Sequence, residues 1–119
     1  MTRVKELTAE GINVSFGHDD IFDPWYPLGC GSMRDVVFMG LHVCQMMGYE
    51  DIMNAYRFVT VNAARTLHIS DRYGIEMGKP ASFVVMDAQN YYDALNYNSP
   101  VLASYRNGKK IEILVNFCP

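Results

Sequence analysis

Residues 15–29 of this chain read SFGHDDIFDPWYPLG, and this stretch decides how the rest of the sequence is interpreted. Residues 12–16 alternate apolar and polar side chains as a short strand does, and Gly17 ends that strand. Pro24 and Pro27 exclude a regular helix interior, so the stretch is expected to form a loop. A carboxylate-rich loop that follows a strand is typical of the catalytic rim of a parallel α/β barrel.

The loop carries several side chains with functional potential. An aspartate at the end of a barrel strand can ligate a divalent metal through one oxygen and accept a proton through the other. Aromatic side chains on the same loop could wall a flat heterocycle. Taken as residue types alone, the carboxylates are better interpreted as turn or cap residues and the histidine as solvated, because short motifs often match by chance. The candidates are His18, Asp19, Asp20, Trp25 and Tyr26.

Two amphipathic helices are predicted after the loop. Ser32, with Asp35 three residues later, is close to a capping box, and apolar side chains then recur at helical spacing until Gly48. Asp51 is expected to cap a second helix, whose apolar positions repeat at three and four up to Leu67.

The apolar pattern then changes to that of strands. Residues 82–86, SFVVM, form a compact apolar run, and residues 101–105 and 111–117 are predicted as two further strands. Asn107 and Gly108 lie between the last two, and this pair favours a type I′ hairpin turn. A small antiparallel sheet is therefore expected near the end of the chain.

The order of these elements predicts an α+β chain. A short helix over residues 2–10, ended by Gly11, precedes the strand and helices described above. Residues 1–70 are expected to hold the strand, the loop and two helices at the end of an α/β unit, and residues 71–119 the antiparallel segment. At 119 residues we expect the two parts to fold as one compact unit.

Composition excludes several classes of protein. Half of the residues are hydrophobic, whereas the net charge of −3 provides no basic face for nucleic acid. The sequence contains neither an apolar run long enough to span a membrane nor a secretory signal at its start. Its three cysteines are widely spaced and form no CxxC pair, which fits a reducing compartment. We therefore expect a soluble cytoplasmic protein that binds neither nucleic acid nor membranes.

Two longer stretches carry a family resemblance. Residues 16–29, FGHDDIFDPWYPLG, followed by MGLHVCQMMGY at 39–49, resemble the final barrel strand, loop and helix of bacterial cytosine deaminases in the amidohydrolase superfamily. TVNAARTL at 60–67 and YGIEMGKPASFVVMDA at 73–88 resemble the superfamily's C-terminal signature. The resemblance, which covers residues 4–111, implies an α+β fragment: the last strand and helices of a TIM-type (β/α)8 barrel, then a small antiparallel sheet from a composite β-sandwich.

The same resemblance implies roles for three loop residues. Asp19 matches the catalytic aspartate that binds the metal and shuttles a proton, and Asp20 matches the neighbouring acid that lines the substrate pocket. Trp25 matches the aromatic residue that packs near the pyrimidine. His18 matches the family sequence without a role that we can assign, and Ser82 replaces an aspartate usual in the family's strand.

The resemblance also implies which parts of a deaminase site are missing. In the family, histidines, including an HxH pair, hold a divalent zinc or iron ion, and a glutamate and a further histidine act on substrate and protons. The histidines here, His18, His42 and His68, form no such pair. One carboxylate, Asp19, cannot replace three or more protein ligands. We therefore expect this chain alone to bind no metal and to deaminate no cytosine, unless a complementary N-terminal chain completes the site.

A non-catalytic function stays open as the alternative. A truncated module would have an oligomeric or small-molecule-binding role, with Trp25 and Tyr26 as a stacking platform. The helix faces that carry Met33, Val37 and Phe58 would need a partner, because large exposed apolar patches normally mark interfaces. Unpaired strand edges also invite association. We expect a homodimer formed through these helix faces or through a sheet edge.

Overall fold

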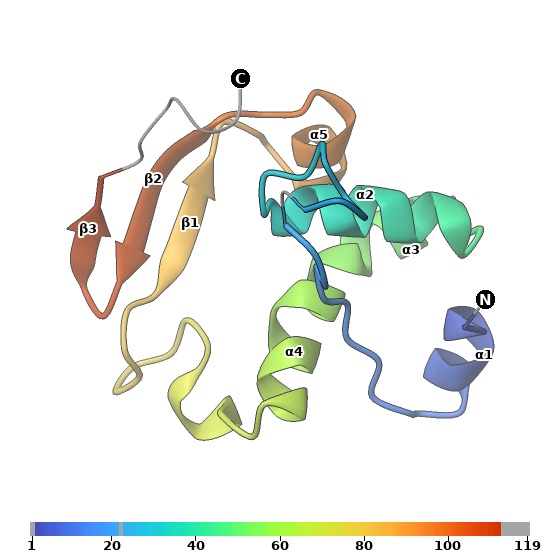
Figure 1. The fold of residues 1–119 in the computed structure, drawn as a ribbon. Coiled ribbons are helices and arrows are strands. Elements are labelled where there is room, and N and C mark those ends of the chain that lie inside the picture. The colour runs from blue at the N-terminus through green and yellow to red at the C-terminus, as the bar shows by residue number, and fades with distance from the viewer. Residues whose placement is uncertain (1, 22, 113–119) are drawn as a thin grey trace.

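Figure 1 shows a small three-stranded sheet on one side of the molecule and short helices on the other. The computed structural model describes residues 2–21 and 23–112. The helical elements are α1 Val4–Ala9, α2 Met33–Val43, α3 Tyr49–Asn54, η1 Ala55–Val59, α4 Val61–Thr66, η2 Ser70–Arg72 and α5 Tyr91–Asn96, where η marks a 3₁₀ helix. The strands are β1 Phe83–Met86, β2 Val101–Arg106 and β3 Lys109–Ile111. The expected α+β class with an antiparallel sheet is confirmed.

The sheet has the order β1-β2-β3, and both pairings are antiparallel. The predicted hairpin turn is confirmed, because Asn107 and Gly108 both have the positive φ that a type I′ turn requires, 51° and 77°. The Gly108 N–H donates to the carbonyl of Ala81 over 2.8 Å, which ties the turn to the residues before β1. The third strand begins at Lys109, two residues before its predicted start, and residues 113–117 of that prediction lie outside the described residues.

Helix α2 begins as predicted and ends earlier than predicted. The Ser32 hydroxyl accepts the backbone N–H of Asp35 over 3.3 Å, so the predicted cap is confirmed. At the other end Gln45 adopts a left-handed φ of 55°, and the Met46 N–H donates to the Leu41 carbonyl over 2.8 Å. These features form a Schellman motif, which ends the helix before Gly48.

The second predicted helix is broken into α3, η1 and α4. It starts at Tyr49, so Asp51 lies inside the first turn and does not cap it. The break falls at Thr60, whose φ of −124° and ψ of −98° are not helical. The Thr60 hydroxyl donates back to the Tyr56 carbonyl over 2.8 Å, a local bond that competes with regular helix geometry.

Helix α5 was not anticipated from the sequence. Asn90 caps it, because its side-chain oxygen accepts the Asp93 N–H over 2.9 Å. The spacing of Asn90 and Asp93 is the feature of the sequence that could have predicted this helix.

None of the helices in the described part of the chain has the length and apolar character that crossing a membrane requires.

The predicted strand over residues 12–16 is wrong. This segment is extended, but its polar groups bond to helical elements and not to a neighbouring strand. The Asn62 side chain donates to the Val14 carbonyl over 2.9 Å, the Asn13 side chain donates to the Asn62 carbonyl over 3.1 Å, and the Phe16 N–H donates to the Phe58 carbonyl over 3.0 Å. An alternating pattern predicts extended backbone, whereas a strand also needs a partner strand.

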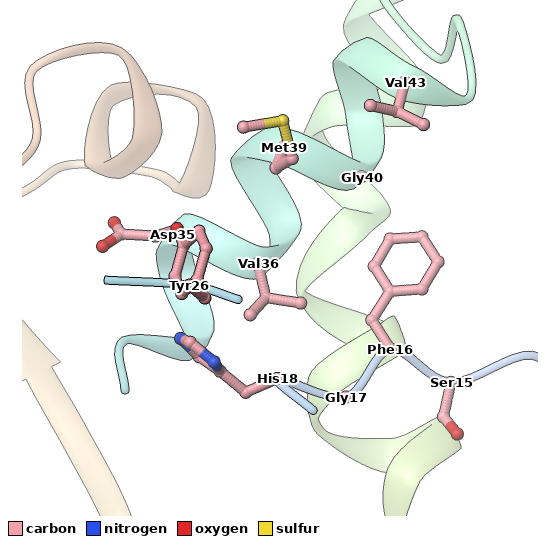
Figure 2. A pocket seen from close by; sticks show the side chains of 10 residues that line it. All are labelled: Ser15, Phe16, Gly17, His18, Tyr26, Asp35, Val36, Met39, Gly40 and Val43. Atoms are coloured by element: carbon pink, nitrogen blue, oxygen red, sulfur yellow. The ribbon is translucent and has the colours of Figure 1, made fainter. Parts of the chain in front are cut away.

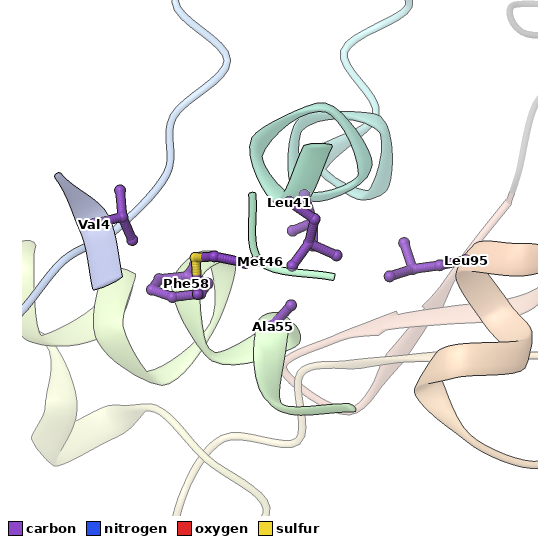
Figure 3. Close-up of a cluster of buried hydrophobic side chains, with 7 residues drawn as sticks. Val4, Leu41, Met46, Ala55, Phe58 and Leu95 are labelled. Carbon is purple, nitrogen blue, oxygen red and sulfur yellow. The ribbon is translucent and has the colours of Figure 1, made fainter. Parts of the chain in front are cut away.

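The core is a single small cluster of buried side chains that come mainly from the helices (Figure 3). It joins α1, α2, η1 and α5 through Val4, Val37, Leu41, Met46, Ala55, Phe58 and Leu95. Phe16 stacks on Phe58 with ring centroids 4.5 Å apart and an interplanar angle of 11°. This stack anchors the extended segment, and hence the start of the rim loop, to the core.

Gly40 of α2 gives the first testable prediction. A Cβ added at Gly40 would meet Cε2 of Phe16 at 2.5 Å, so the helix backbone can approach the ring only without a side chain there. Gly→Ala inside a helix normally stabilises by up to about 1 kcal/mol. Here we expect Gly40→Ala to lower the free energy of unfolding by about 1–3 kcal/mol, as overpacking does, measured by urea denaturation.

The matched control for this prediction is the double variant Gly40→Ala, Phe16→Leu. The smaller leucine at position 16 makes room for the new methyl group. Gly40→Ala should therefore lower the free energy of unfolding less in a Phe16→Leu background than in the original chain. A gain in stability for Gly40→Ala alone would contradict the predicted contact.

Candidate functional site

The rim loop, residues 17–21 and 23–31 of the described chain, places Asp19 at the centre of a tight turn. The Asp20 N–H donates to the His18 carbonyl over 2.9 Å, and Asp19 between them has a positive φ of 61°. A bond between residues two apart around a positive φ is a strained γ-turn. Strain of this kind costs about 1–3 kcal/mol and persists only where the surroundings hold it.

A second bond spans the same turn. Nδ1 of His18 lies 2.6 Å from the Asp20 carbonyl oxygen. One hydrogen bond contributes about 0.5–1.5 kcal/mol net, so two bonds together span the cost of the strained turn, whereas one bond reaches only the lower part of that range. The His18 ring also meets the edge of the Tyr26 ring, with centroids 5.5 Å apart and planes at 67°.

The carboxyl groups of Asp20 and Asp23 are joined by a hydrogen bond. Asp23 Oδ1 accepts the backbone N–H groups of Tyr26 and Trp25 over 2.9 and 2.8 Å. These bonds, the Tyr26 N–H first, hold the pKa of Asp23 below its ordinary value. The hydrogen bond to Asp23 raises the pKa of Asp20, and desolvation and the nearby negative charges add to it. The hydrogen bond between the two carboxyl groups therefore favours the protonated form of Asp20 and the ionised form of Asp23.

A pocket of about 390 Å³ lies between the rim loop and α2 (Figure 2). Ser15, Phe16, Gly17, His18 and Tyr26 line one side, and Asp35, Val36, Met39, Gly40 and Val43 of α2 line the other. Figure 2 shows the His18 and Tyr26 rings close together at one end, with Phe16 further along. The structure thus brings His18 and Tyr26 together over an apolar helix face.

The residues predicted from the family resemblance lie elsewhere on the loop. Asp19, Asp20 and Trp25 are not among the lining residues of this pocket, and Trp25 is 87% exposed. Their predicted catalytic and substrate-binding roles stay predictions. Sequence reasoning gave Gly29 no role. A Cβ there would lie 2.1 Å from Cδ1 of Tyr26, so Tyr26 can occupy its place only over a glycine.

The described residues do not by themselves fit a divalent metal. Across residues 2–21 and 23–112, no three histidine, cysteine, aspartate or glutamate side chains gather closely enough to hold an ion. His42 bonds through Nδ1 to the Phe38 carbonyl of its own helix over 2.8 Å and packs on the Phe38 ring. The metal-binding role of Asp19 stays a prediction, and a protein metal site needs several ligands.

The relationships of the chain follow from its sequence and fold together. A family model described as the amidohydrolase family matches residues 1–111. The chain belongs to the amidohydrolase family. A curated relative, N-isopropylammelide isopropyl amidohydrolase of Pseudomonas sp. strain ADP, is 30% identical over 115 residues, which cover 94% of this chain and 28% of that protein.

Solved structures of the amidohydrolase family are similar across nearly the whole chain. 5-Methylcytosine deaminase from Klebsiella pneumoniae, liganded with 5-fluorocytosine, is 47% identical with a TM-score of 0.88, over 94% of this chain and 27% of that one. N-isopropylammelide isopropylaminohydrolase from Burkholderia multivorans is 26% identical with a TM-score of 0.83, over 92% and 28%. The predicted resemblance to cytosine deaminases is confirmed. This amidohydrolase chain spans less than a third of each relative.

The hydrogen bond between Asp20 and Asp23 leads us to expect different pKa values for the two carboxyl groups. In carboxyl NMR spectra we expect the pKa of Asp20 above that of an ordinary aspartate, because of its hydrogen bond to Asp23, and the pKa of Asp23 below it, because of the Tyr26 N–H. Asp20 therefore stabilises the fold in acid and loses that contribution as the pH rises through its raised pKa. Asp23 contributes above the ordinary range and loses its contribution as the pH falls through its lowered pKa.

Asp23→Asn tests whether the hydrogen bond to Asp23 is what raises the pKa of Asp20. The asparagine keeps an oxygen for the Trp25 and Tyr26 N–H groups but cannot accept the proton as a carboxylate, so the pKa of Asp20 should fall. Asp87→Asn, at an exposed site after β1, is the control and should leave Asp20 unchanged. Titration of Asp20 below Asp23 in the original chain would contradict the pairing.

Proposed function

We propose that this chain supplies the C-terminal barrel end and rim loop of a cytosine-deaminase-like amidohydrolase, which hydrolytically removes the amino group of cytosine or a related cyclic amidine. The observation that carries the proposal is the 47% identity and TM-score of 0.88 to 5-methylcytosine deaminase over 94% of the chain. The two relatives named for N-isopropylammelide are only 26% and 30% identical, so they are a weaker guide to the substrate than the deaminase.

In this proposal Asp19 and Asp20 are the working carboxylates and Trp25 is a wall for the heterocycle. The γ-turn supports the assignment of Asp19, because strained non-glycine backbone clusters at functional sites. The exposure of Trp25 fits a residue whose opposite wall belongs to another part of the enzyme. The divalent zinc or iron ion implied by the resemblance needs donors beyond the described residues, with Asp19 as the one from this chain.

The proposal implies that the chain is inactive by itself. Purified chain with added Zn²⁺ or Fe²⁺ should release no ammonia from cytosine or 5-methylcytosine, because one carboxylate cannot assemble a catalytic metal site. Intact Klebsiella 5-methylcytosine deaminase serves as the positive control. Turnover by the isolated chain would show that it needs no further donors.

A chimera tests the positive half of the proposal. The matching 27% of the Klebsiella enzyme is replaced by this chain, and ammonia release from 5-methylcytosine is measured. We expect activity in the chimera and a loss of about 10²–10⁴-fold for Asp19→Asn, the usual worth of a proton-transferring group. Asp71→Asn, on the exposed surface of η2, is the matched control. A folded, active chimera that tolerates Asp19→Asn would overturn the role of Asp19.

We also propose that the exposed apolar faces make the isolated chain self-associate. Leu102, Val84 and Ile111 share one sheet face by their register and are 57%, 51% and 44% exposed. An open cleft of about 870 Å³ separates the sheet from α2 and α5, with Val84 and Ile111 among its mostly apolar lining. A surface of this kind normally belongs to an interface.

Size-exclusion chromatography with light scattering checks this association. We expect a dimer at micromolar concentration and a shift toward monomer for Leu102→Lys, because a charge on the sheet face opposes its burial. Lys110→Arg, which keeps the charge of the exposed strand β3, should not change the mass. A clean monomer of the original chain would argue against the proposal.

A further inference from the structure

His18 is tied to both sides of Asp19. Its carbonyl accepts the Asp20 N–H over 2.9 Å, and its ring Nδ1 lies 2.6 Å from the Asp20 carbonyl oxygen. The two bonds close a small ring of atoms around the one residue of the rim loop that is not glycine and has positive φ. The two bonds therefore restrict the backbone conformations that Asp19 can adopt.

We propose that His18 is a positioning residue whose Nδ1–H holds the γ-turn that presents the Asp19 carboxylate. The inference rests on the proposed function only in taking Asp19 as the working carboxylate. His18 itself acts through the turn and not on a substrate. Without the ring bond, the turn at Asp19 keeps a single backbone bond and opens toward ordinary extended geometry.

The geometry fixes the tautomer of the His18 ring. A carbonyl oxygen can only accept a hydrogen bond, so Nδ1 must carry the hydrogen that reaches the Asp20 carbonyl. In the neutral ring Nε2 is then the acceptor. A histidine that only packed against Tyr26 would be free to adopt either tautomer.

Tyr26 and Gly29 hold the ring in its place. The Tyr26 ring meets the His18 ring edge-on at 5.5 Å, and Figure 2 shows the two rings side by side. A Cβ on Gly29 would lie 2.1 Å from the Tyr26 ring and 3.3 Å from Cε1 of His18. The Tyr26 ring therefore occupies space that only a glycine at position 29 leaves open, and the His18 ring lies close to the same space.

Nitrogen-15 NMR of the original chain tests the proposal without any substitution. We expect the ring signals of His18 to show the hydrogen on Nδ1, and the ¹³Cα and ¹³Cβ shifts of Asp19 to show left-handed backbone. A His18 ring with its hydrogen on Nε2 would overturn the proposal.

Two variants separate the ring bond from ring packing. His18→Asn keeps an N–H donor near the position of Nδ1 but removes the ring, whereas His18→Phe keeps a ring beside Tyr26 but removes the donor. We expect exchange of the Asp20 amide hydrogen to quicken about tenfold in His18→Phe, the effect of losing one hydrogen bond, and to stay within about threefold in His18→Asn. The Asp19 shifts should move in His18→Phe and be restored in His18→Asn.

The opposite pattern would show that the ring only packs. In that pattern His18→Asn changes the Asp19 shifts and the Asp20 exchange rate, whereas His18→Phe leaves both as in the original chain. Unchanged α2 amide signals serve as the folding control for both variants. These readouts need no enzymatic activity, so an inactive deaminase chimera would count against the proposed function and leave the role of His18 to be decided by the spectra.

Discussion

Phe16 lies flat on Phe58 with the ring centroids 4.5 Å apart, and its backbone N–H donates to the Phe58 carbonyl. This double contact fixes the extended segment before the rim loop against η1, while the absence of a side chain at Gly40 lets α2 come close to the same ring. Phe16 packs against the small core and also lines the pocket. Because the segment before the loop has no strand partner in the described structure, its position depends on the Phe16 contacts and a few side-chain bonds to α4.

From that anchor the rim loop is held by bonds within itself. His18 and Asp20 brace the turn at Asp19, and Asp23 gathers the N–H groups of Trp25 and Tyr26. Bonds between residues this near in sequence need no distant segment as a partner. A loop of this kind can keep a carboxylate in a defined place, as the proposed function requires of Asp19.

Other parts of the surface expose apolar side chains. The core cluster is small, whereas the sheet face with Val84, Leu102 and Ile111 and the cleft behind it leave apolar side chains open. The chain spans 27–29% of these structural relatives.

The sequence by itself determined the features that depend on neighbouring residues: the Asn107-Gly108 turn, the Ser32 cap of α2, and the family to which the loop motif belongs. The turn and the cap are set by backbone preferences and side chains a few positions apart. Only the tertiary structure decided that residues 12–16 bond to helices, that Thr60 interrupts the second helix, and that His18 and Tyr26 meet over Gly29. These depend on which distant segments lie opposite, and a periodic pattern carries no information about its partner.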